Sequence, residues 1–220
     1  MTSKPCSALA AAVLISLPLA ATAQLPSLKN LPGLPGLPLG GNSADAGAIA
    51  GQNDSLVRGY VGANKDVLLA NALMAEALGL KDQAATARAT ADALTEGATK
   101  GNLEDSNKAV SASTAAVAEA MAKHPQLDAQ SKATYQSGLA KLAQGVIRYV
   151  KLRKPAQDFS AGLKGAAPTA LPKLQSGIYI VSQLPGGISN LATSLQNATA
   201  FAKSNDIPVP PDATQALASL

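Results

Sequence analysis

The chain has 220 residues, of which 3% are aromatic and none is tryptophan, so rings that stack on bases or sugars are scarce. This composition argues against single-strand nucleic-acid binding and against a carbohydrate site. The formal net charge of +4 is uneven, because residues 24–131 carry 8 Lys and Arg against 11 Asp and Glu, whereas residues 132–220 carry 9 against 3. Such asymmetry steers a charged partner without identifying it.

The N-terminus has the three parts of a secretory signal peptide. A positively charged start precedes an almost entirely apolar run over residues 8–21, and an A-x-A motif ends at Ala23. We therefore expect cleavage between Ala23 and Gln24, and a mature protein in the periplasm or, alternatively, outside the cell. Cleavage would also remove Cys6, the only cysteine, so neither a disulfide nor a lipid-anchored cysteine is expected in the mature chain.

Residues 24–52 are rich in leucine, proline and glycine. The triplets Leu31-Pro32-Gly33 and Leu34-Pro35-Gly36 repeat with the three-residue period of polyproline II, and proline does not suit a helix interior. This pattern predicts a disordered, flexible linker. The alternative interpretation is that the leucine edge of this segment docks on the folded domain or on a partner.

From residue 53 onward, apolar residues recur every three or four positions, which is the spacing of one face of a helix. Four main helices are predicted around the stripes 56–74, 80–94, 103–121 and 135–149. Gly138 and Gly145 weaken the fourth helix but permit the close approach of a neighbour. Outside the N-terminal signal sequence, no segment approaches the roughly 18 apolar residues that a transmembrane helix needs.

Several residues are expected to begin or end these helices. Asp54-Ser55 offers an N-cap for the first helix, Gly79 ends it, and Asn102 opens the third. His124-Pro125 ends the third helix and Pro155 the fourth, because the residue before a proline is displaced from the helical region.

Beyond Pro155 the predicted helices are shorter. They cover residues 156–163, 171–181 and 188–198, and Pro185-Gly186-Gly187 separates the last two. Residues 205–220 are expected to form a proline-rich loop and a short tail helix. The sequence thus predicts an all-α domain over residues 53–204, arranged as an up-down antiparallel bundle of about four main helices with shorter C-terminal helices.

Few residues suit catalysis or metal binding. His124 is the single histidine and is interpreted as a capping or solvated residue, while the adjacent pair Glu104-Asp105 is expected in the favourable first turn of a helix. No phosphate-binding loop or dinucleotide fingerprint is present. We therefore predict no catalytic residue, no cofactor and no metal site, and a protein that is not an enzyme.

Residues 147–154 are the most distinctive charged segment. Arg148, Lys151 and Lys154 recur every three residues, and Arg153 lies beside them. One interpretation is a solvated helix end whose charges complement the helix dipole. The functional interpretation is a basic amphipathic helix that binds an anionic surface.

Together these features predict an exported, non-enzymatic α-helical envelope protein that acts as a binding module. Its partner is expected to be a protein or an apolar, lipid-like ligand rather than nucleic acid. One alternative is a peripheral binder of anionic lipid or polymer through residues 147–154. A second alternative is a hydrolase that uses carboxylates or His124.

Overall fold

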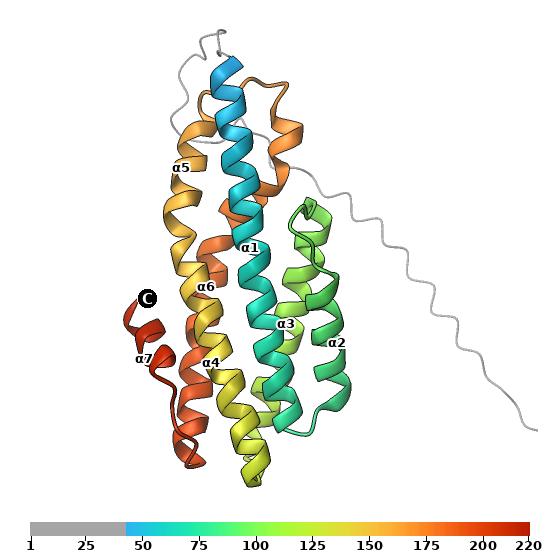
Figure 1. Cartoon of the computed structure of the whole chain (residues 1–220), viewed down its shortest axis with the longest axis vertical. Coiled ribbons are helices and arrows are strands. Elements are labelled where there is room, and N and C mark those ends of the chain that lie inside the picture. Colours follow the sequence, from blue (N-terminus) through green and yellow to red (C-terminus); the bar gives the residue numbers. More distant parts are fainter. Residues whose placement is uncertain (1–42) are drawn as a thin grey trace, which may run out of the picture. The chain divides into compact units, whose positions relative to one another are not determined.

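The computed structural model describes residues 43–220, with side chains from Gly47 onward. This part of the chain is all-helical, as predicted, and contains no strand (Figure 1). The predicted cleavage site and residues 24–42 of the predicted linker lie outside it. The elements are α1 (Ser43–Ala77), α2 (Lys81–Ala93), α3 (Lys100–Ala122), α4 (Ala129–Lys151), α5 (Arg153–Leu163), the 3₁₀ turn η2 (Leu171–Leu174), α6 (Gln175–Ser204) and α7 (Pro211–Ala218).

α1 is the central helix of the described domain, since it packs against α2, α3, α4, α5 and α6. It begins at Ser43, so residues 43–52, which were predicted as linker, are helical. Asp54 and Ser55 therefore do not cap the helix. The sequence suggested a cap there, but tertiary contacts extend the helix: Ile49 is buried, and Asn53 Oδ1 accepts a hydrogen bond from the Gly177 amide at 3.0 Å.

α4 packs on α1 more extensively than any other described pair of helices. Two glycines make this approach possible. A Cβ on Gly138 would lie only 3.1 Å from the Ala70 carbonyl oxygen and the Met74 amide nitrogen, and a Cβ on Gly145 only 2.8 Å from Val67 Cγ2. The close approach predicted at these glycines is confirmed.

A chain of polar side chains crosses the core between α1, α3, α4 and α6. The Tyr149 hydroxyl donates to Asn64 Oδ1, and Asn64 Nδ2 donates to Asn107 Oδ1 at 3.1 Å. Tyr60 donates to the same Asn107 oxygen at 2.9 Å, and Asn107 Nδ2 donates to the Tyr179 hydroxyl at 2.8 Å. Because buried polar groups need partners, this network fixes which faces of the four helices meet.

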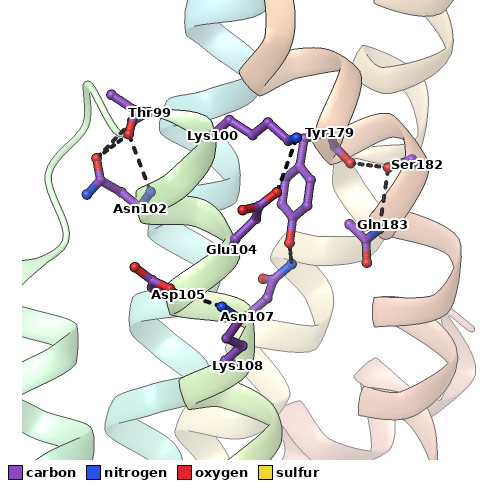
Figure 2. Close-up of polar contacts among 10 residues, drawn as sticks. All are labelled: Thr99, Lys100, Asn102, Glu104, Asp105, Asn107, Lys108, Tyr179, Ser182 and Gln183. Carbon is purple, nitrogen blue, oxygen red and sulfur yellow. Dashed lines mark hydrogen bonds and ion pairs between the residues drawn. The ribbon is translucent and has the colours of Figure 1, made fainter. Parts of the chain in front are cut away.

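α3 begins earlier than predicted, and Figure 2 shows its first turns beside α6. Thr99 Oγ1 accepts a hydrogen bond from the Asn102 amide at 3.3 Å, and Asn102 Oδ1 accepts one from the Thr99 amide at 3.1 Å. Asn102 is thus the third helical residue of a capping box rather than the start of the helix. Consequently Glu104 and Asp105 lie beyond the first turn, and each pairs instead with a lysine of α3.

Pro155 does not stop the fourth predicted helix. α4 ends at Lys151, and α5 begins at Arg153 after the single residue Leu152, so Pro155 lies in the first turn of α5. Proline is tolerated there because the first amides of a helix have no intrahelical acceptor. α5 continues in the direction of α4, which departs from a simple up-down order (Figure 1).

Pro185 does not separate two helices either, since it lies inside the 30-residue α6. Leu184 and Ile188, on either side of it, are buried and hold both halves of the helix against the core. Close by, a Cβ on Gly187 would lie 3.2 Å from the ring of Tyr149. The prediction of short C-terminal helices is therefore wrong for α6, whereas the short tail helix α7 follows its proline-rich loop as expected.

We expect the buried tyrosines to make the fold sensitive to high pH. Burial raises the pKa of Tyr60, Tyr135 and Tyr149 above the ordinary value. A raised folded-state pKa gives stability that is fully present below the unfolded value of about 10 and is lost as the pH rises through the folded value. We therefore expect the urea midpoint of unfolding, followed by circular dichroism, to fall progressively above about pH 10.

The variant Tyr135→Phe serves as the comparison for this prediction. It removes hydrogen bonds to Ala198 O and Met121 Sδ, so it is less stable at neutral pH, but it also removes one titrating group. Its midpoint should fall less steeply with pH than that of the unaltered protein. Parallel curves for the two proteins would contradict the assignment of alkaline sensitivity to this tyrosine.

Candidate binding groove

α5 and α6 border a groove of about 590 Å³ at the surface of the domain. Its lining residues are Arg153, Ala156, Gln157, Ser160, Ala161 and Lys164 from α5 and its C-cap, and Val181, Leu184, Pro185 and Ile188 from α6. Within each helix these positions are spaced by one, three or four residues, as expected for a single helical face. The groove is therefore bounded by two facing stripes.

The two walls differ in chemistry. The α6 wall carries only apolar side chains, with Leu184 and Ile188 buried at its base. The α5 wall carries small or uncharged side chains between two basic residues, Arg153 and Lys164. Eleven positions separate these two residues, which is about 16 Å along a helix. The groove thus combines an apolar wall with a positive charge toward each end.

Two of the four basic residues predicted to bind anions pair with carboxylates of the described domain. Arg148 Nε lies 2.6 Å from Asp66 Oδ2 on α1, and Lys141 Nζ lies 2.9 Å from Asp66 Oδ1. Asp66 Oδ2 accepts no well-aligned hydrogen bond within the described residues, so its contact with Arg148 is an ion pair. Lys154 pairs with Asp158 at 2.6 Å. Arg148 and Lys154 thus have acidic partners within the domain.

The break between α4 and α5 separates the other two predicted residues. Lys151 is exposed at the end of α4. Arg153 begins α5 and lines the groove, and its Nη2 lies 3.4 Å from the Leu220 carbonyl oxygen. Of the four residues predicted from the sequence, Arg153 is the one that belongs to the groove. The predicted cleavage residues Ala23 and Gln24 lie outside the described part of the chain.

The position of His124 is consistent with its interpretation as a capping or solvated residue. It follows the end of α3 with a left-handed φ of 47°, and its side chain is exposed. In the described part of the chain, no group of three or more His, Cys, Asp or Glu residues is placed to hold a metal ion. None of the described helices combines the length and the apolar character needed to cross a membrane.

A second cavity, of about 390 Å³, lies between α1 and the loop before α3. Its lining includes charges of both signs, Asp54, Arg58 and Glu96. Two of its polar side chains already have partners, since Asn53 accepts from the Gly177 amide and Ser176 donates to a carbonyl oxygen at 3.4 Å. The α5–α6 groove, with its apolar wall, is the better candidate for a ligand.

Sequence reasoning missed Lys164 and the α6 wall of this groove. The spacing of Ala156, Ser160 and Lys164 predicts that they share one face of a helix. Only the packing of α5 against α6 shows that this face borders the apolar residues of α6. No protein-family model, curated protein or solved structure matches this chain.

Proposed function

We propose that this protein is an exported, non-enzymatic binding module of the cell envelope and that the α5–α6 groove binds its ligand. The observation that carries the proposal is the wholly apolar α6 wall of a groove of about 590 Å³. That size lies within the roughly 300–1,000 Å³ of small-molecule sites. Export is proposed from the signal-peptide pattern that ends at Ala23.

The size of the groove favours a small apolar ligand over a folded partner. Ten residues line it. One side of a stable protein interface of standard size has roughly 20–30 residues. The walls also supply no histidine, cysteine or carboxylate, which supports binding rather than catalysis in this groove.

The absence of tryptophan from the sequence allows a direct test. Gln157→Trp places a single tryptophan at an exposed position that lines the groove. We expect dodecanoate or dodecanol, added below its aggregation threshold, to change the emission of this variant in a saturable manner. Ala115→Trp, at an exposed position of α3 away from the groove, should show no such change.

A second pair of substitutions locates the binding site. In the Gln157→Trp protein, Val181→Asp places a charge on the apolar wall and should abolish saturable binding. Ser182→Asp, at the next and exposed position of α6, should leave it intact. If neither ligand alters the Gln157→Trp emission, or if both substitutions act alike, the proposed function is wrong.

A further inference from the structure

We infer that the groove selects a single-chain amphiphile with an anionic head group, in monomeric form, an inference that rests on the proposed function. The ligand's acyl chain lies along Val181, Leu184 and Ile188, and its head group meets the positive charge at one end of the groove, that of Arg153 or that of Lys164. The inference names the class of ligand, which the apolar wall alone does not specify.

Charge complementarity is the first argument. The groove lining carries two cations and no anion. α6 has no acidic residue along its whole length, and the single acidic residue of α5, Asp158, is outside the lining and pairs with Lys154. Within the described residues, the Arg153 guanidinium has a polar contact only with the Leu220 carbonyl oxygen, at 3.4 Å. A neutral or cationic head group would leave the nearer of Arg153 and Lys164 without a counterion from the ligand, whereas a carboxylate or phosphate accepts charge-assisted hydrogen bonds from that residue.

The dimensions of the walls are the second argument. From Val181 to Ile188 the apolar wall extends over seven positions, or about 10 Å along the helix, while Arg153 and Lys164 lie about 16 Å apart. An extended acyl chain that covers the apolar wall therefore ends near a basic residue. One chain fills this length, and its head group reaches the charge without leaving the groove.

The test compares dodecanoate with dodecanol, which share a chain and differ in head-group charge. In the Gln157→Trp protein we expect dodecanoate to bind about tenfold more tightly than dodecanol, which corresponds to about 1.4 kcal/mol. Higher salt should reduce this preference, because the basic residues are exposed.

Matched double variants assign the preference to the groove. Arg153→Gln with Lys164→Gln should remove the preference for dodecanoate over dodecanol. Lys151→Gln with Lys173→Gln removes the same net charge at exposed positions outside the groove and should preserve the preference. Urea unfolding of both variants checks that each remains folded.

The outcomes separate this inference from the proposed function. Equal affinity for the two ligands, or equal effects of the two double variants, would overturn the anionic selectivity while leaving apolar binding established. Co-sedimentation with phosphatidylglycerol vesicles tests whether the anionic head groups belong to lipids in a bilayer rather than to a monomeric ligand. If Arg153→Gln with Lys164→Gln abolishes vesicle binding while monomeric dodecanoate does not bind, the inferred monomeric ligand is wrong.

Discussion

Replacing Gly138 and Gly145 together by alanine should lower the free energy of unfolding by about 3 kcal/mol. Each new methyl group enters the contact between α1 and α4. At Gly138 it meets the backbone at Ala70 and Met74, which cannot move aside as a flexible side chain does. Separating the two helices would loosen the largest helix contact of the domain. Urea denaturation followed by circular dichroism measures the loss.

The matched control makes the same substitution at Gly51 and Gly186. Both lie within helices, and a Cβ at either position meets nothing within 4 Å. Because alanine is favoured over glycine in a helix by about 0.5–1 kcal/mol, this double variant should be more stable than the unaltered protein. Opposite signs for the two double variants are expected, and similar changes would refute the close-packing argument.

Removing both cations from Asp66 should cost about 3 kcal/mol of stability. The Asp66 side chain is only 9% exposed, whereas Lys141 is 33% and Arg148 59% exposed. The substitutions Lys141→Ala and Arg148→Ala therefore leave the buried Asp66 carboxylate without a cation, and an unpaired buried charge destabilises the folded state. Equilibrium urea unfolding at neutral pH measures the change.

Two comparisons show whether the buried charge causes this loss. Lys151→Ala with Lys154→Ala removes two exposed cations at the junction between α4 and α5. This double variant should change the free energy of unfolding by less than about 1 kcal/mol. Adding Asp66→Asn to the first double variant removes the unpaired charge and should recover part of the stability. A failure of Asp66→Asn to recover any would show that lost packing, not charge, is responsible.

The periodicity of the sequence was sufficient to predict the helical stripes and several helix ends. Tyr135, Leu139 and Tyr149 lie on the buried face of α4 as predicted, and Gly79 follows α1 with a positive φ. Side-chain pattern predicts these features because a helical face depends only on neighbouring positions in the chain.

Features that depend on distant segments were not predictable in this way. Asp66 resembles any solvated helical carboxylate until α4 supplies its two cations. Pro185 resembles a helix break until the buried residues on either side show that packing holds α6 together. The groove forms only where α5 packs beside α6. The charge pattern in the sequence therefore pointed to Arg153, but it did not show that Arg153 lies opposite an apolar wall.

The position of α1 in the chain also bears on how the protein is made. α1 ends at Ala77, but its most extensive partner, α4, begins only at Ala129. The hydrogen bond from Tyr149 to Asn64 spans 85 positions, and that from Gly177 to Asn53 spans 124. A ribosome produces α1 before α4, so the face of α1 that α4 covers has no partner until α4 has been made, whereas α2 and α3 follow α1 directly. Folding that must wait for such distant contacts is slower than folding of a helical bundle built from local contacts.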